Sequence, residues 1–400
     1  MDKKTERGER LNFAAQAKRL QADIVRDRRY FHRHPELSFQ EKETSAYIGA
    51  RLKEMGLTPH TFEDYYGLYA DVGRGERMIL LRADIDALPV CEKTGADYAS
   101  QNEGVMHACG HDAHAAMLLG AARLLADHAD QLGGRVRLLF ESAEESCYGA
   151  RYYVEQGIAD GALAVFGQHV WGDLNAPGIN IEAGQRMTSC DNFTIKVSGK
   201  SAHASAPNDG VDAIVAAAGL ITAIQTIVSR KNDPRNSLAI SIGEIHGGQR
   251  FNIIADTVVM KGTVRTHSPE TRARVEGWLR EVVESTASVY GAAGELEYEY
   301  FPSPVINDEH YTHLAQKAAV SLFGPDCLLP MEKTMLSEDF SYYEQKAPGV
   351  FAFIGARNEK TGMVYKNHNE RFEADEEGLW RGAALYAQFA YDCLNEKDRS

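Results

Sequence analysis

Cysteine is scarce in this 400-residue chain: six are present, and their spacing forms no short disulfide framework. Free thiols in a reducing cytosol fit this pattern. No window approaches the roughly 20 consecutive apolar residues of a membrane span. The charged first ten residues also lack the apolar core of a signal peptide. The sequence therefore predicts a cytoplasmic protein with no membrane association.

Positive charge is also in short supply, since 43 Lys and Arg face 57 Asp and Glu, for a formal net charge of −14. This balance argues against a nucleic-acid partner. The chain has no Walker A sequence, no Gly-x-Gly-x-x-Gly after a strand and no Gly-x-Ser-x-Gly nucleophile elbow. These absences disfavour nucleotide-binding and serine-hydrolase chemistry.

Apolar runs alternate with helical patterns through the first 170 residues and again after residue 302. Four strand-like runs carry this pattern, at residues 78–81, 135–140, 162–166 and 350–354. Helical segments separate them, among them residues 113–128, and a final helix is expected from residue 374. The alternation predicts an α/β fold with a mostly parallel sheet flanked by helices.

Between residues 192 and 301 the order changes to strand, helix, strand, strand, helix, strand. This βαββαβ order is that of the ferredoxin-like split motif, a complete small domain. At 400 residues the chain also exceeds the usual limit for one hydrophobic core. We therefore expect a main domain from residues 1–186 and 302–400, with residues 187–301 inserted as a second domain.

The most specific motif is His107-Ala-Cys-Gly-His-Asp-Ala-His114, which places three imidazoles, a thiol and a carboxylate at a helix start. A bend at Gly110 would let Cys109 and His111 converge on one cation. This mixture of ligands suits zinc, with manganese, cobalt or nickel as alternatives. The competing interpretation is a polar helix start capped by Asp112, but capping requires only one such residue. The two histidines at the ends of the motif are interpreted as supporting or surface groups.

Two adjacent carboxylates, Glu144 and Glu145, follow the apolar run at 135–140. Such a pair in a loop often indicates only solvent exposure. After a buried strand, however, one carboxylate could bind metal while the other acts as general base toward a water molecule. The need for both roles at one place explains the pair.

Two single histidines, His169 and His368, also follow predicted strands. Each alone is equally well explained as a hydrogen-bonded core or loop residue. Ligands of open α/β sheets bind at the carboxyl ends of the strands, so the shared location favours a site. Together with Cys109, His111 and Glu145 they would make five ligands, enough for two metal ions when one ligand bridges.

Asp86 is better placed to orient an imidazole or a thiolate than to bind metal, although a turn residue before Pro89 also explains it. Cys109 with a distant histidine is also the pattern of a cysteine-protease nucleophile. The metal-type ligands around Cys109 make coordination the better use.

The inserted domain contributes three polar candidates. His203 could donate a hydrogen bond to the oxyanion of a tetrahedral intermediate, and Asn252 with Arg265 could hold a substrate carboxylate. An ordinary exposed polar side chain is at least as good an explanation for each, on spacing alone.

These residues make the chain resemble the aminoacylase/carboxypeptidase family of di-metal amidohydrolases, in the branch with hippurate hydrolase, indoleacetyl-amino-acid hydrolases and N-acetyldiaminopimelate deacetylase. The resemblance covers nearly the whole chain. Its motifs are Phe31-His-Arg-His-Pro-Glu-Leu-Ser38, Arg82-Ala-Asp-Ile-Asp-Ala-Leu-Pro89, the Cys109/His111 motif, Ala143-Glu-Glu145, Gly167-Gln-His169, Ser201-Ala-His-Ala204, Ser337-Glu-Asp-Phe340 and Asn367-His-Asn-Glu370.

The resemblance implies a zinc-exopeptidase-like main domain that binds two divalent metal ions, zinc or manganese first. It implies five ligands, Cys109, His111, Glu145, His169 and His368. Cys109 would take the bridging role that aspartate has in other branches, and Glu144 would be the general base.

The resemblance also implies a homodimer formed through the inserted domain, with His203 reaching the partner's active site or closing over its own. Asn252 and Arg265 would contact the terminal carboxylate of the substrate. One departure concerns the glutamate pair, which the family commonly flanks with proline and glycines. This chain has Ser142 before the pair and residues 146–148, Ser-Cys-Tyr, after it.

The predicted function is metal-dependent hydrolysis of the amide bond of an N-acyl amino acid or related small acyl conjugate. Metal-activated water would attack the carbonyl, Glu144 would act as general base, and His203 would support the oxyanion. A dipeptidase or aminopeptidase on the same metals is an alternative, distinguished by a requirement for a free substrate amine. A degenerate member that binds metal or ligand without turnover is another, which hydrolysis abolished by chelator and by Glu144→Gln would exclude.

Overall fold

The computed structural model describes residues 11–396, which form two compact units. Unit 1 contains the described residues up to Gly184, then Asn307–Glu332 and the described residues from Tyr342 onward. Unit 2 contains Gln185–Ile306 and Lys333–Ser341. Each unit has its own cluster of buried apolar side chains.

Residues 333–341 lie in unit 2, whereas the sequence placed them with the main domain. Backbone hydrogen bonds explain the difference, because Thr334 N donates to the Arg186 carbonyl and Thr188 N donates to the Leu336 carbonyl. The ring of His267 adds a contact, with Nε2 2.8 Å from the Thr334 carbonyl oxygen. This segment therefore returns to unit 2 after the helix Glu309–Phe323 of unit 1.

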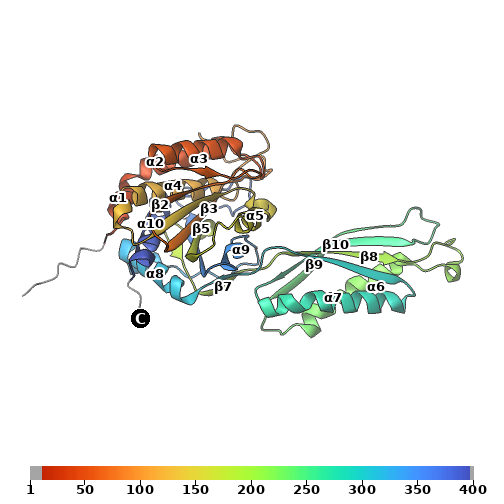
Figure 1. Cartoon of the computed structure of the whole chain (residues 1–400). Helices are drawn as coiled ribbons and strands as arrows, with labels where there is room; N and C mark the ends of the chain where they lie inside the picture. Colours follow the sequence, from red (N-terminus) through yellow and green to blue (C-terminus); the bar gives the residue numbers. More distant parts are fainter. Residues whose placement is uncertain (1–10, 397–400) are drawn as a thin grey trace, which may run out of the picture. The chain divides into compact units, whose positions relative to one another are not determined.

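Unit 1 is built on a seven-stranded sheet (Figure 1). Its strands are β1 (His60–Thr61), β2 (Leu68–Gly73), β3 (Met78–Asp84), β4 (Arg135–Glu141), β5 (Ala162–Asn175), β6 (Ile179–Asn180) and β13 (Gly349–Arg357). The strand order is β1-β2-β4-β3-β5-β13-β6. The four central strands run parallel, and β1, β2 and β6 are antiparallel to their neighbours. The predicted mostly parallel sheet is confirmed.

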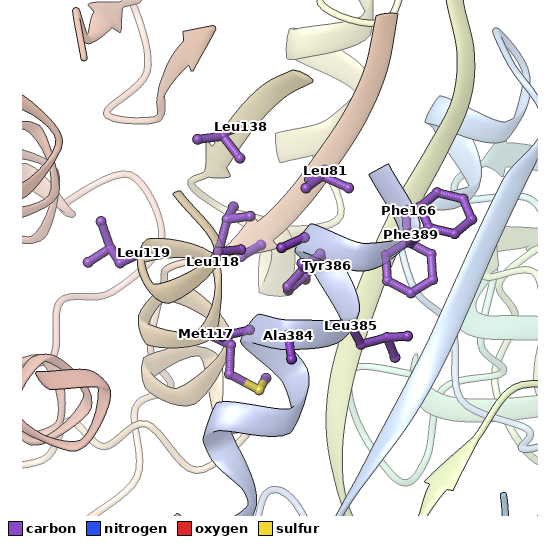
Figure 2. Packing of buried hydrophobic residues seen from close by; sticks show 14 of the residues in the cluster. Leu81, Met117, Leu118, Leu119, Leu138, Phe166, Ala384, Leu385, Tyr386 and Phe389 are labelled. Carbon is purple, nitrogen blue, oxygen red and sulfur yellow. The ribbon is translucent and has the colours of Figure 1, made fainter. Parts of the chain in front are cut away.

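Helices flank this sheet. They are α1 (Ala14–Arg19), α2 (Gln21–Arg33), α3 (Lys42–Glu54), α4 (His111–Ala126), α5 (Gly149–Glu155), α8 (Glu309–Phe323), α9 (Ser341–Glu344) and α10 (Leu379–Asn395). The main core lies between the sheet, α4 and α10, where Phe166 of β5 stacks on Phe389 of α10 at 4.4 Å (Figure 2). Helix α4 is buried along most of its length. This packing fixes the helix whose first residue is His111.

Two predicted boundaries in unit 1 were wrong. The last helix begins at Leu379 rather than at residue 374, because Asp375 caps a separate 3₁₀ turn, Glu376–Gly378, by accepting from Glu377 N. Strand β5 runs to Asn175 instead of ending at residue 166, since it pairs along its length with β13. His169 therefore lies within a strand and not after one.

Unit 2 has the predicted βαββαβ order. Its elements are β8 (Asp191–Ser198), α6 (Ala213–Thr226), β9 (Leu238–Gly247), β10 (Thr257–Thr266), α7 (Pro269–Val289) and β11 (Ala293–Tyr300). The antiparallel sheet has the order β11-β8-β10-β9, which is the split-motif arrangement. Pro269 stands at the first position of α7, where its missing N–H costs nothing. The short strands β7 (Gly184–Met187) and β12 (Val305–Asn307) pair where the chain enters and leaves the unit.

One helical segment, Ala213–Lys231, is long and apolar enough to cross a membrane by length and composition, contrary to the sequence expectation. It comprises α6 and a π-helical turn, Ile227–Lys231. Ala217, Leu220 and Ile224 on one face belong to the core of unit 2. Core helices of globular domains pass the same test, so length and composition alone assign no membrane.

Candidate metal centre

The carboxyl edge of the unit 1 sheet carries most of the predicted site. Asp84 is the last residue of β3, and Asp86 follows two residues later. Glu144 and Glu145 begin a 3₁₀ turn, Glu144–Ser146, directly beyond β4. Because β3 and β4 are parallel neighbours, the two acidic pairs lie side by side.

Gly110 bends the chain between Cys109 and His111. It has φ of 100°, the left-handed region that favours glycine, and it precedes α4. A Cβ at this position would lie 2.2 Å from Val170 Cγ2, so a larger residue would require the Val170 side chain or the turn to move. The close approach of this turn to β5 brings Cys109 Sγ to 3.3 Å from His169 Nε2.

All five predicted ligands have side-chain atoms in shared clusters. Cys109, His111 and His169 form one group whose ligand atoms lie within 4.8 Å of one another. Cys109 with Glu145 and His368 forms a second group, and His111 with Glu144 and Glu145 forms a third. The structure thus brings together residues that are up to 259 positions apart in the sequence, from Cys109 to His368.

Two imidazoles are held in one orientation by acceptors at Nδ1. His111 Nδ1 lies 3.1 Å from Asp86 Oδ1, and His169 Nδ1 lies 2.7 Å from the Val170 carbonyl oxygen. Each acceptor favours a proton on Nδ1, which leaves the Nε2 lone pair available to a cation.

Asp86 contacts three parts of the site. Its Oδ2 accepts from the Glu145 backbone N–H at 3.1 Å and from the Ser38 hydroxyl at 2.7 Å, while Oδ1 faces His111. The predicted orienting role of Asp86 matches these contacts. Ser38 belongs to one of the family motifs, but a serine after a leucine gives by itself no signal of a contact with Asp86.

Asn367 connects three ligand segments and was missed by sequence reasoning. Its Nδ2 donates to the Cys109 carbonyl at 2.8 Å and to the Val170 carbonyl at 3.1 Å. Its Oδ1 accepts from Gly172 N at 3.0 Å. His368, the next residue, has φ of 68°, a conformation that few non-glycine residues adopt. Asn367 therefore fixes the loop that presents His368, which lies eleven residues beyond the end of β13.

A network of buried, hydrogen-bonded side chains links strands β3 and β5. His114 Nδ1 lies 2.5 Å from Asp84 Oδ1, and His114 Nε2 accepts from Val170 N at 2.8 Å. Arg82 pairs with Asp84 at 2.8 Å and with Glu141 at 2.7 Å. His114 is thus a fully buried group with Asp84 as its partner, and of the two interpretations that the sequence left open, the surface position does not apply.

The buried charges make this a negative site. Burial lowers the pKa of His111, but Asp84 and Asp86 raise it more, to about 10. Burial raises the pKa of Glu145 to about 7, against the attraction of His111. Burial also holds the pKa of His169 well below its usual value, so this imidazole is neutral. At neutral pH His111 therefore carries a second proton, and the surplus of acids around it suits a divalent cation that would replace this proton.

Two buried atoms of the cluster, His111 Nε2 and Glu145 Oε1, have no hydrogen-bond partner among residues 11–396. Buried polar atoms are usually satisfied by protein, water or ions. A thiol, imidazoles and a carboxylate within 4.8 Å form the mixed donor set that zinc and similar ions accept. The residues present therefore fit metal ions.

The polar candidates of unit 2 lie in separate places. His203 is exposed, and its Nδ1 accepts from Ser205 N at 3.2 Å, which puts the ring proton on Nε2. Asn252 is near it, since Ala204 N donates to the Asn252 carbonyl. Arg265 stands towards the other end of β10 and donates to Ser337 Oγ at 2.8 Å.

Asn252 lies in the loop before β10, whereas Arg265 lies near the far end of that strand. The loop with Asn252 enters β10 at Thr257, and Arg265 is eight residues along that strand. At 3.3 Å per residue this separation is roughly 26 Å. The joint contact of Asn252 and Arg265 with one substrate carboxylate stays a prediction.

A model of peptidase family M20/M25/M40 matches residues 80–392. The chain belongs to this family. The predicted resemblance to aminoacylase-type and carboxypeptidase-type hydrolases is confirmed, and the chain is an M20 hydrolase.

Relatives of this M20 protein cover nearly all of it. N-acetyl-L-cysteine deacetylase of Bacillus subtilis (strain 168) is 39% identical over 387 residues, 95% of this chain and 90% of the relative. IAA-amino acid hydrolase ILR1-like 4 of Arabidopsis thaliana is 36% identical over 379 residues, 93% of this chain and 86% of the relative. The crystal structure of a dinuclear metal-binding M20 peptidase from Bacillus subtilis superposes with a TM-score of 0.84 at 34% identity, covering 95% and 100% of the two chains.

Proposed function

We propose that this M20 hydrolase cleaves the amide bond of N-acyl amino acids or related small acyl conjugates. The gathering of five ligand-type side chains beside a second glutamate carries the proposal. The relatives named as an N-acetylcysteine deacetylase and an IAA-amino acid hydrolase support this substrate class.

Cys109, His111, Glu145, His169 and His368 would hold two divalent metal ions, with zinc or manganese as the first candidates. The related Bacillus subtilis structure is described as a dinuclear metal-binding peptidase, which supports two ions. Cys109 shares one group with His111 and His169 and another with Glu145 and His368, so its thiolate would lie close to the other four ligands. When bound, such ions would polarise the substrate carbonyl and lower the pKa of a water molecule.

Glu144 would act as the general base. It lies beside His111 and Glu145 in one cluster, and its side chain is 9% exposed. In this role Glu144 takes a proton from the attacking water and delivers it to the leaving amine, so that the amide carbon exchanges its nitrogen for the water oxygen. Asp86 keeps the neighbouring His111 ring and the Glu145 backbone in place.

His203 would support the oxyanion through Nε2–H, and Asn252 and Arg265 would contact the substrate carboxylate. Asn252 lies in the loop before β10 and Arg265 near the far end of the strand, and this placement supports contributions from two copies of the chain rather than one. A homodimer formed through unit 2 is accordingly part of this proposal. Light scattering of the purified protein would give the mass of a dimer, and a monomer mass would contradict this part.

The experiment that tests the proposed function compares wild-type protein and Glu144→Gln, both loaded with zinc or manganese, on acetyl-, benzoyl- and indoleacetyl-amino acids. Wild-type hydrolysis should stop when chelator is added. Glu144→Gln should bind the same amount of metal but lose about 10²–10⁴ in kcat, because a general base is removed. Failure of the wild type to release any amino acid, or full activity of Glu144→Gln, would contradict the proposal.

A further inference from the structure

The glutamate turn, residues 143–147, carries Glu144 and Glu145 between two residues in the left-handed region. Ala143 has φ of 65° and Cys147 has φ of 62°. Neither is a glycine, so each conformation costs free energy and persists only where surrounding contacts hold it. Cys147 also belongs to the segment in which the family commonly has glycines. The contacts that hold this turn therefore decide the position of Glu144.

A buried carboxyl from a distant segment makes one of these contacts. Glu41 Oε1 accepts from Ala143 N at 2.8 Å, across 102 positions of the sequence. The Glu41 side chain is fully buried, and its other oxygen, Oε2, has no hydrogen-bond partner among residues 11–396. A buried carboxyl that is only partly satisfied costs free energy, which favours a role at the site over a role in stability.

Glu41 does not serve the helix that begins beside it. It is the N-cap residue of α3, but its side chain caps no backbone N–H of that helix. Glu36 takes this task, since its carboxylate accepts from Glu43 N at 3.1 Å and from Thr44 N at 2.8 Å. The Glu41 carboxyl is thereby left for the glutamate turn.

Different contacts hold the two glutamates of the turn. Glu145 N donates to Asp86 Oδ2 at 3.1 Å, and a bound ion would add a second restraint through the Glu145 carboxylate. Glu144 is not a ligand in the proposed centre, and it directly follows Ala143, the residue that Glu41 holds. Loss of the Glu41 contact should therefore disturb the base more than the metal ligand.

We propose that Glu41 is a positioning residue for the general base Glu144, because its carboxyl oxygen fixes Ala143 N and with it the strained turn. This inference rests on the proposed function of Glu144, although the contact itself can be tested without turnover. A displacement of about 1 Å can lower a catalytic rate about 100-fold. The position of Glu144 therefore has a measurable effect on kcat.

Three variants separate the acceptor oxygen from the bulk of the side chain. Glu41→Gln keeps an oxygen for Ala143 N, whereas Glu41→Met has a similar volume and no oxygen. Glu36→Ala is the matched control, because it removes a carboxylate that binds the backbone of α3 and not the glutamate turn. The kcat, the KM and the bound metal are measured for each variant on an acetyl-, benzoyl- or indoleacetyl-amino acid that the wild type hydrolyses.

We expect Glu41→Met to lose about 10- to 100-fold in kcat, with KM and metal content within about twofold of wild type. Glu41→Gln should keep most of the wild-type kcat, because the acceptor oxygen is restored, and Glu36→Ala should keep it as well. Equal losses of kcat in Glu41→Gln and Glu41→Met, or in Glu36→Ala and Glu41→Met, would overturn the inference. A loss of metal that accounts for the lower kcat of Glu41→Met would overturn it too.

Hydrogen exchange of the peptide that spans residues 142–148 tests the contact without catalysis. In metal-loaded protein, this peptide should exchange about 10-fold faster in Glu41→Met than in wild type, Glu41→Gln or Glu36→Ala, as expected for one lost hydrogen bond. If the wild type hydrolyses no substrate, the proposed function fails, but faster exchange in Glu41→Met still supports the contact of Glu41 with the turn. Unchanged exchange overturns it. Glu41→Ala replaces Glu41→Met in both measurements where the methionine variant does not fold.

Discussion

Asn367 illustrates how much of the centre depends on a single residue that is not itself a ligand. Its side-chain amide forms hydrogen bonds with the backbone of the Cys109 and His169 segments, at the Cys109 and Val170 carbonyls and at Gly172 N. Asn367 itself directly precedes the ligand His368. Asn367→Ala removes all three hydrogen bonds. We expect metal affinity to fall about 10- to 100-fold, as for other groups that orient metal ligands.

Competition with a chelator measures this affinity directly. Asn369→Ala is the matched control, because Asn369 lies in the same loop and its side chain accepts a hydrogen bond from Arg371 N, at 2.9 Å. Equal affinities for Asn367→Ala and wild type would show that the loop is held by other contacts.

Glu41 predicts a specific pH dependence of stability. Burial and the nearby Asp86 raise its pKa from 4.5 to about 8 in the folded protein. Between these values the unfolded chain is ionised at Glu41 while the folded chain keeps the proton, so stability falls as pH rises from 4.5 to about 8 and then levels off. Glu41→Gln stays neutral and retains an oxygen for Ala143 N.

The metal-free Glu41→Gln protein should therefore gain stability over wild type as pH increases. The gain should be near zero at pH 4.5 and reach its maximum above pH 8. Thermal unfolding of both proteins across this range checks the prediction. A stability difference that does not change with pH would mean that Glu41 titrates alike in the folded and unfolded states.

At the scale of elements, the site depends on the close approach of the turn before α4 to strand β5. Gly110→Ala would place a Cβ 2.2 Å from Val170 Cγ2, in addition to the strain of φ near 100°. Gly95→Ala is the matched control, since Gly95 has φ of 76° and no atom within 4 Å of the added Cβ. We expect Gly110→Ala to be less stable than Gly95→Ala by about 1–3 kcal/mol, the usual cost of overpacking.

Gly110→Ala should also lose metal, because Cys109 and His111 flank the displaced turn. Urea unfolding and metal analysis of the two variants test both effects. Similar stability and metal content in Gly110→Ala and Gly95→Ala would contradict the packing argument.

Apolar periodicity predicted the elements that are buried on both faces. The continuous apolar run of β3 is such a case, as expected for a central parallel strand. The edge strands β1 and β6 contain two residues each and leave no period to detect. The extension of β5 to Asn175 was missed because pairing with β13, and not residue preference, maintains it.

At the scale of the whole molecule, the alternation of strands and helices, together with the βαββαβ block, predicted the fold class from sequence. The sequence predicted the gathering of the ligand residues from positions at strand ends, but of these ligands only Glu145 directly follows a strand, and His169 lies within β5. The supporting contacts of Ser38, Asn367 and Asp84 could not be predicted, because they join segments that are distant in sequence and each uses a common residue type. The return of residues 333–341 to unit 2 likewise depends on backbone hydrogen bonds that leave no pattern in the sequence.

The proposed hydrolysis requires metal ions held among five side chains, Cys109, His111, Glu145, His169 and His368. Anomalous diffraction at the zinc or manganese edge, from crystals of the metal-loaded protein, tests this claim most directly. We predict two peaks, each within bonding distance of these side chains, with Cys109 Sγ next to both. Peaks elsewhere, or no peak among these five residues, would contradict the proposed metal centre.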